Sequence, residues 1–404
     1  MTTTHPTRVD AVIIGAGYAG LLAASMISLY DVDVLVLAGQ GTPAGADGTL
    51  PATRPGQVLH VGGINDVQDL VYGSVAELRA RGAQDSPLPP LRGSVIERPQ
   101  RDQPPLWGPT GLLSCSQELL NAVLRNIVVA NPGHGRETRV WDDAVAVGFI
   151  GDEEQVRGVR VRLGGDVVHE VIADLVVDAS GADSLTPSWL TAMGHSNASV
   201  STTATSAWAS RLYRAPAGHE AVPVTAVADG AHSAVLVPIE NGMWMVSQTT
   251  SASEELTDGS AFEKAALALS DPRVGDLISQ AAPLGEVDCP AATESRWRRY
   301  DQARTWPRRL VVLGDACATF SPGRACGPQA AEASVRALRL ALADGGLAHP
   351  TLARRAQRGI GKEIARLWPQ PALARQPAPN HRPLTQLVGR AGTAFGRLIA
   401  ARAS

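Results

Sequence analysis

The sequence of 404 residues lacks the features of a membrane, secreted or nucleic-acid-binding protein. Its formal net charge is only −3, so we expect no electrostatic attraction to nucleic acid or to an anionic membrane. No apolar run approaches the ~20 residues that cross a bilayer. The N-terminus also lacks the basic and apolar segments of a signal peptide. We therefore expect a cytoplasmic protein without a membrane span.

Cysteine is scarce as well. The four cysteines are Cys115, Cys289, Cys317 and Cys326, and none of them forms a CxxC pair. This spacing indicates neither a disulfide framework nor a zinc site. We find no Ser-His-Asp arrangement, no metal-ligand cluster and no internal repeat, so no metal is predicted.

A glycine-rich turn follows the first strand-like segment. The apolar run from Val9 to Ile14 leads into Gly15, Gly17 and Gly20, and a helix-like segment continues from there. In a strand–turn–helix unit the first glycine permits the tight turn, the second lets a pyrophosphate approach the backbone, and the third allows close packing of helix on strand. This context indicates dinucleotide binding.

The second strand, residues 32–37, ends where such folds place an acid for the adenosine ribose. Ala38 stands at that place here. A methyl group accepts no hydrogen bond. We therefore expect that Gln40 or a water molecule binds the ribose hydroxyls in its place, or that the adenosine part of the dinucleotide binds more weakly.

A second glycine motif lies near residue 314. The apolar strand 310–313 delivers Gly314 and Asp315, and Gly327 with Pro328 then opens a helix. A carboxylate at the end of a strand is suited to accept hydrogen bonds from ribityl or ribose hydroxyls. Proline at the first helical position leaves the helix N-terminus free to face an anion or a flavin carbonyl.

The pattern of the remaining sequence predicts the other elements. We expect a long loop over residues 41–63, helices over 67–81, 116–129 and 262–269, a meander over 144–150 and 155–163, a strand over 172–177, an antiparallel sheet over 202–250, and helices from 328 onward. Ser116 is the expected N-cap of its helix.

Together these motifs give the chain a family resemblance over roughly residues 9–340. It resembles the FAD-dependent monooxygenases that hydroxylate or epoxidise aromatic and polyketide substrates, and the related halogenases and geranylgeranyl reductases. The resemblance rests on Gly15-x-Gly17-x-x-Gly20, on the helix that starts at Gln117, on the segment 176–184, and on Gly314-Asp315. It implies FAD as cofactor, with Asp315 at the ribityl chain and Gln117 near the flavin phosphates.

The sequence also departs from this family. Ala38 replaces the usual glutamate, Ala182 stands where an arginine is common, and Ser180-Gly181 replaces the Asp-Gly pair of hydroxylases that use NADPH. After Pro322 the usual Gly-Gln-Gly run is absent. These changes predict weaker FAD binding and slow direct reduction by NADPH.

The resemblance implies a doubly wound α/β FAD-binding domain with an inserted antiparallel β-sheet substrate domain and C-terminal helices. We divide the chain into FAD-binding segments 1–85, 111–200 and 301–340, a connector 86–110, a substrate domain 201–300, and a helical segment 341–404.

Three residues are candidates for the substrate site. His60 follows the long loop, where the family tends to place a histidine near flavin or substrate; a loop-capping histidine is the other interpretation. Trp208 and Trp244 lie in the antiparallel sheet, where they form either an apolar substrate wall or part of the core.

Three functions remain open. The first is a flavin-dependent monooxygenase or oxidoreductase that acts on a bulky apolar metabolite such as a polyketide or terpenoid. The second is a redox-neutral cyclase on the same fold, which holds a chain in a reactive conformation, with FAD structural or absent. The third is a binding protein without flavin.

Overall fold

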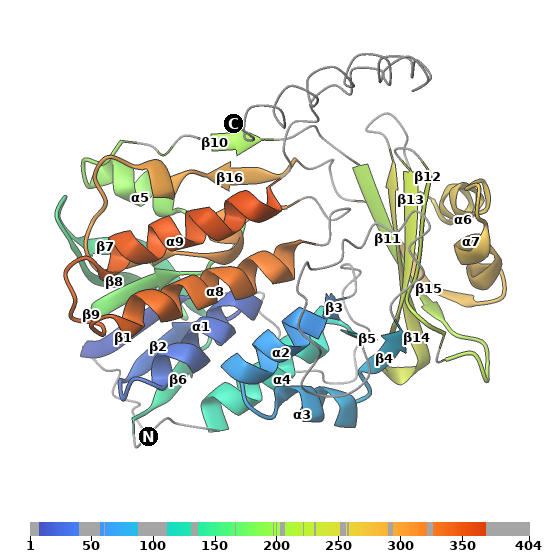
Figure 1. Cartoon of the computed structure of the whole chain (residues 1–404), viewed down its shortest axis with the longest axis horizontal. Coiled ribbons are helices and arrows are strands. Elements are labelled where there is room, and N and C mark those ends of the chain that lie inside the picture. The colour runs from blue at the N-terminus through green and yellow to red at the C-terminus, as the bar shows by residue number, and fades with distance from the viewer. Residues whose placement is uncertain are drawn as a thin grey trace, which may run out of the picture. The chain divides into compact units, whose positions relative to one another are not determined.

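A seven-stranded mixed sheet is the largest sheet of the described residues and lies in the left-hand half of Figure 1. The computed structural model describes residues 8–39, 57–59, 61–87, 111–130, 136–165, 167–196, 198, 200–202, 207–220, 222–229, 232–250, 256, 258–289, 294–320 and 326–368. The strand order is β6-β2-β1-β9-β8-β7, and β17 pairs with β9. The bounds are β1 Arg8–Ile14, β2 Val34–Leu37, β6 Thr138–Trp141, β7 Ala144–Gly151, β8 Val156–Leu163, β9 Val168–Asp178 and β17 Leu310–Val312.

Five of these strands run parallel, and their carboxyl ends meet at one edge of the sheet. Ile14 of β1 lies beside Leu37 of β2 and Asp178 of β9, and Val312 of β17 lies on the other side of Asp178. Apolar residues fill β2 and β17 and most of the carboxyl-terminal halves of β1 and β9, and they are buried there because both faces of a parallel sheet are covered. Ligands of open α/β sheets bind at this carboxyl edge.

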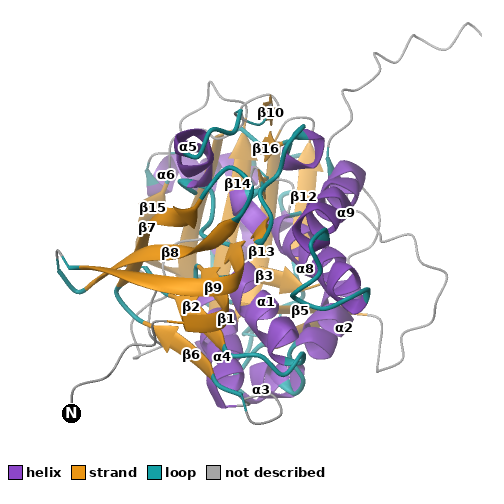
Figure 2. Cartoon of the chain, turned by 90° about the vertical axis from the view of Figure 1, so that its left-hand side faces the viewer, coloured by secondary structure: helices purple, strands orange, loops and turns teal. Residues whose placement is uncertain are grey.

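Helices cover one side of the sheet (Figure 2). They are α1 (Tyr18–Ser28), α2 (Val61–Leu70), α4 (Gln117–Ala130), α8 (Gly327–Ala343) and α9 (Leu352–Leu367), and α3 (Ser74–Ala80) follows α2. The α1 helix is buried along most of its length, since small or apolar residues occupy most of its positions. A helix that is apolar on all sides belongs in the interior.

A second, antiparallel sheet has five strands in the order β12-β13-β14-β11-β15. Their bounds are β11 Ala207–Arg214, β12 Thr225–Asp229, β13 His232–Ile239, β14 Met243–Thr250 and β15 Ala282–Asp288. Helices α6 (Gly259–Leu267) and α7 (Arg273–Ile278) lie on one side of this sheet, and β4 and β5 approach it from the other (Figure 1).

Two small sheets and several short elements complete the description. One sheet has the order β3-β5-β4, with β3 Gln57–Leu59, β4 Gln84–Pro87 and β5 Gly111–Cys115, and the other β10-β16-β18, with β10 Val200–Thr202, β16 Arg296–Arg298 and β18 Ala318–Thr319. The short helices are α5 (Thr186–Ala192), η2 (Glu240–Gly242), η3 (Tyr300–Gln302) and η4 (Gly314–Ala316).

The predicted fold class is confirmed: the chain has a doubly wound α/β part with an inserted antiparallel sheet. Two local predictions were wrong. The expected helix over 67–81 is two helices, because Gly73 has a φ of +86° and interrupts the pattern. The expected loop over 41–63 contains β3 and the start of α2. The domain boundaries stay a prediction, and residues 369–404 lie outside the described residues.

Candidate functional site

The glycine-rich turn lies between β1 and α1. Gly15 has a φ of +107°, which residues with a side chain rarely adopt. A methyl group on Gly15 would stand 2.4 Å from the carbonyl oxygen of Ala179, and one on Gly20 would stand 2.0 Å from that of Gly15. At Gly17, by contrast, no atom lies within 4 Å of the position that a Cβ would take. Gly15 and Gly20 are needed for packing, whereas Gly17 faces open space at a helix N-terminus.

The second glycine motif touches the first. Gly314 starts the η4 turn directly after β17 with a φ of +61°. A methyl group on Gly314 would stand 2.7 Å from the Cβ of Ala19, in the first turn of α1. The tertiary structure thus brings together two motifs that lie about three hundred residues apart in the sequence, as a shared site needs.

Asp315 follows in the η4 turn and presents its side chain to solvent. No hydrogen bond to its carboxylate comes from the described residues, although its backbone carbonyl accepts one from Thr319 Oγ1 at 3.1 Å. Surrounding protein atoms nevertheless desolvate the group and raise the pKa of the Asp315 carboxyl. A carboxylate that is exposed, partly desolvated and without a side-chain partner is suited to accept hydrogen bonds from ligand hydroxyls.

The middle motif is held by a buried carboxylate at the end of β9. Asp178 accepts hydrogen bonds from Ser180 N at 2.9 Å, Ser180 Oγ at 2.6 Å, Ser184 Oγ at 2.5 Å and Thr186 Oγ1 at 2.6 Å. Because a buried charge is costly unless it is hydrogen-bonded, these donors fix the loop that follows β9. The hydroxyl of Ser180 therefore has a structural partner in this chain.

Arg298 joins the middle motif to the second glycine motif. Its Nη1 donates to the carbonyl oxygen of Ala316 at 3.1 Å, and its Nη2 donates to that of Ala182 at 2.9 Å. The arginine that the family tends to carry at position 182 is absent, but a guanidinium from β16 binds the backbone at the same place. Arg298 was not predicted from the sequence, since it is one of three arginines in the segment 296–299 and nothing in the pattern distinguishes it from the other two.

The N-terminus of α8 forms as predicted, with Gly327 as its first residue and Pro328 in its first turn. No atom lies within 4 Å of the position that a Cβ on Gly327 would take. Further along α8, the carboxylate of Glu332 accepts a hydrogen bond from Tyr18 Oη at 2.6 Å. This pair was not predicted from the sequence. The one indication was a glutamate among the small, apolar residues at the start of α8.

The start of α4 is joined to the antiparallel sheet. Ser116 Oγ accepts a hydrogen bond from Leu119 N at 3.0 Å, which confirms Ser116 as the N-cap. Glu240 of η2 accepts hydrogen bonds from the backbone N–H and the hydroxyl of Ser116. Gln117 follows as the first residue of α4 and is half-buried. Its predicted place near the flavin phosphates stays a prediction.

The two candidate tryptophans lie on opposite faces of the five-stranded sheet. Trp244 is 0% exposed and packs with Phe262 of α6 and Val274 of α7. Successive side chains of a strand point to opposite faces of the sheet. Along β11, Tyr213 therefore lies on the face of Trp244, whereas Trp208 lies with Leu212 on the opposite face. This placement assigns Trp244 to the core beneath the helices, so of the two only Trp208 lies on the face away from α6 and α7.

Ala38 follows β2 and is buried. Its side chain is only 1% exposed, its N–H donates to Trp141 O at 2.8 Å, and its carbonyl accepts from Ala144 N at 3.0 Å. Its predicted place beside the ribose stays a prediction. Gln40 and His60 lie outside the described residues.

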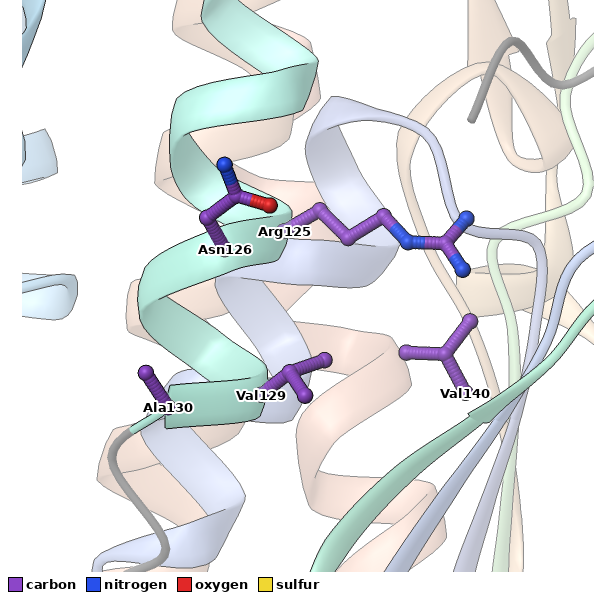
Figure 3. Close-up of a pocket in the computed structure, with 5 residues that line it drawn as sticks. All are labelled: Arg125, Asn126, Val129, Ala130 and Val140. Atoms are coloured by element: carbon purple, nitrogen blue, oxygen red, sulfur yellow. The ribbon is translucent and has the colours of Figure 1, made fainter. Parts of the chain in front are cut away.

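A surface pocket of about 390 Å³ lies between α4 and β6 (Figure 3). Its lining residues are Arg125, Asn126, Val129, Ala130 and Val140. Arg125 forms an ion pair with Asp142 at 2.7 Å. Because none of these residues belongs to a glycine motif, the pocket is separate from the candidate site.

The described residues show neither a metal centre nor a membrane span. No group of three or more His, Cys, Asp or Glu side chains there is placed to hold a metal ion. Within the same residues no helix is long and apolar enough to cross a membrane.

Comparison with known proteins places this fold among flavin-dependent enzymes. The chain is similar to the myxobacterial chondrochloren halogenase CndH, described as an FAD-dependent halogenase, with a TM-score of 0.65 and 17% identity over 90% of this chain and 79% of that one. It is also similar to PqsL of Pseudomonas aeruginosa, described as a probable FAD-dependent monooxygenase, with a TM-score of 0.62 and 17% identity over 89% and 94%. The fold is thus that of FAD-dependent halogenases and monooxygenases.

In sequence, the chain is 28% identical to protein Rv3254 of Mycobacterium tuberculosis over 337 residues, which cover 77% of this chain and 68% of that protein. No model of a protein family matches the sequence.

Proposed function

We propose that the chain binds FAD between its two glycine motifs and acts as an FAD-dependent oxidoreductase of the monooxygenase type. The observation that carries this proposal is the contact between the two motifs. Gly314 lies against Ala19, so the open space beside Gly17 and the exposed carboxylate of Asp315 adjoin one helix N-terminus. The fold shared with FAD-dependent halogenases and monooxygenases supports the same cofactor.

The residues present fit the cofactor. Backbone N–H groups at the start of α1 would hold the pyrophosphate, because a helix N-terminus favours an anion and Gly17 leaves the backbone accessible. Asp315 would accept hydrogen bonds from ribityl hydroxyls, and the first turn of α8 at Gly327 would face the flavin ring. When bound, FAD supplies the electron-transfer and oxygen chemistry that amino-acid side chains lack.

For the substrate we propose a bulky apolar metabolite, such as a polyketide or terpenoid. The support is the apolar face of the five-stranded sheet that lies away from α6 and α7. Its side chains include Leu212, Val237, Ile239, Met243 and Met245. Apolar side chains dominate small-molecule sites, and methionine adapts to irregular shapes. Trp208 shares this face.

A titration with FAD tests the proposal. We expect the purified protein to bind FAD with a saturable change in flavin absorbance and fluorescence. Asp315→Asn should weaken binding about tenfold, the value of roughly one good hydrogen bond. The matched control is Arg339→Gln, which changes one exposed residue of α8. No binding by the wild-type protein would contradict the proposal.

Reduction of the bound flavin tests the oxidoreductase part. Dithionite needs no binding site, so it should bleach the flavin absorbance of the loaded protein in the absence of oxygen. NADPH should reduce the bound flavin slowly, because Ser180 replaces the acid of the Asp-Gly pair and its hydroxyl donates a hydrogen bond to Asp178. A bound flavin that dithionite leaves oxidised would contradict an oxidoreductase and favour the redox-neutral cyclase. Rapid bleaching by NADPH would contradict the role assigned to Ser180.

A further inference from the structure

Tyr18 and Glu332 connect the first turn of α1 to the second turn of α8 at the candidate site. Tyr18 follows Gly17 directly and is the first residue of α1, and Glu332 lies near the start of α8. The Tyr18 hydroxyl donates to Glu332 Oε1 at 2.6 Å. This bond is the side-chain link between the helix that would hold the FAD pyrophosphate and the helix that would face the flavin ring.

The pair is surrounded by few charges. Glu332 is only 3% exposed. The other ionisable groups that act on the pair are Asp66 of α2, Arg336 of α8 and Cys115 of β5. Arg336 is already in an ion pair with Asp66. Among the described residues, Glu332 therefore has a hydrogen-bond donor in Tyr18, while the nearby cation, Arg336, is paired with Asp66.

These surroundings control the charge of Glu332. Burial raises the pKa of its carboxyl to about 7; the hydrogen bond from Tyr18 and the nearby Arg336 oppose this rise, and Asp66 adds to it. Burial also raises the pKa of Tyr18 well above its ordinary value, so the phenol stays protonated and donates. Near neutral pH Glu332 thus changes between a neutral and an ionised form.

The two forms differ in their effect on an anion at α1. Tyr18 donates to a carboxyl oxygen of Glu332 in either form, so the link between the helices persists. The ionised form adds a negative charge beside the hydroxyl of Tyr18, the residue that follows Gly17 at the start of α1, where the phosphates of FAD would lie. Because like charges repel and the surroundings are desolvated, the ionised form opposes phosphate binding.

We propose that Glu332 is a positioning residue for FAD: through Tyr18 it holds the first turn of α1 in place for the pyrophosphate, and FAD binds more tightly when the carboxyl group of Glu332 carries no charge. This inference rests on the proposed function. It makes FAD affinity dependent on pH through a residue that touches neither the phosphates nor the flavin.

FAD titrations of the wild type, Glu332→Gln, Tyr18→Phe and Arg339→Gln, from about pH 6 to about pH 9, test this inference. In the wild type the dissociation constant should rise with pH above about 7, by at most about tenfold per pH unit. Glutamine keeps the shape and the acceptor but does not titrate, so Glu332→Gln should keep the low-pH affinity over the whole range. Tyr18→Phe should bind more weakly at every pH, and the control Arg339→Gln should follow the wild type.

The outcomes separate the inference from the proposed function. A wild type that binds FAD with no dependence on pH contradicts the inference alone, and this result needs no variant to fold. An unchanged pH profile in Glu332→Gln also contradicts it alone. A wild type that fails to bind FAD at any pH contradicts the proposed function and, with it, the inference.

Discussion

The carboxylate of Glu240 accepts a hydrogen bond from the backbone N–H of Ser116 at 3.0 Å, although 124 residues separate the two. Glu240 begins η2, the short turn between β13 and β14 of the antiparallel sheet. Ser116 is the N-cap of α4 in the α/β part. Nearby, Ser114 Oγ donates to Pro238 O at 2.7 Å. A buried carboxylate therefore joins the sheet that we propose for the substrate to a helix of the cofactor-binding part.

Ser116→Ala should destabilise the protein by about 2–4 kcal/mol, because it removes the N-cap of α4 and one of the donors to buried Glu240. Urea unfolding followed by circular dichroism measures this as a lower midpoint. Ser279→Ala removes an exposed hydroxyl bonded to Asp276 O and serves as the control, with a change within about 0.5 kcal/mol. Equal effects of the two substitutions would contradict a joining role for Ser116.

Gly17→Ala and Gly20→Ala should separate ligand binding from folding. A methyl group on Gly17 meets no atom within 4 Å, so stability should change by no more than about 1 kcal/mol, whereas FAD affinity should fall at least about tenfold. A methyl group on Gly20 would stand 2.0 Å from Gly15 O, and Gly20→Ala should lose about 3 kcal/mol or more. Thermal unfolding and FAD titration measure both effects. An unchanged FAD affinity of Gly17→Ala would contradict the placement of the FAD phosphates beside Gly17.

Asp315→Asn should weaken FAD binding without loss of stability. Desolvation raises the pKa of the Asp315 carboxyl, so folding favours its protonated form. For an acid whose pKa is raised by folding, the stability it contributes falls as pH rises through its titration range. Asparagine removes this loss, and the variant should be at least as stable as the wild type at neutral pH. A lower melting temperature of Asp315→Asn at neutral pH would show that the carboxylate stabilises the fold instead.

Trp244→Ala should lower stability by about 3–5 kcal/mol, the usual cost of removing a large buried aromatic side chain. Because Trp244 packs against Phe262 of α6 and away from the α/β part, the FAD affinity of the folded protein should not change. Urea unfolding and FAD titration at low urea provide the two measurements. A large loss of FAD affinity with little loss of stability would contradict the core placement of Trp244 and indicate that it contacts the ligand.

Strands and the local parts of the motifs were predictable from the sequence because they depend on neighbouring residues. The apolar runs of β1 and β17, the N-cap at Ser116 and the helix after Pro328 all formed where short-range pattern placed them. The helix break at Gly73 was missed, since the apolar spacing of three and four residues continues across it. Backbone conformation at a glycine is set by tertiary packing as much as by its neighbours.

The sequence by itself determined the two glycine motifs, since each is a run of adjacent residues whose sizes and polarities are sufficient, and the resemblance that these motifs carry implied the fold class. Only the tertiary structure decided which residues meet. It buried Ala38, put Trp208 and Trp244 on opposite faces of one sheet, and brought Tyr18 to Glu332. The physical reason is that burial, and with it the charge of a carboxyl group such as that of Glu332, depends on atoms contributed by distant segments of the chain.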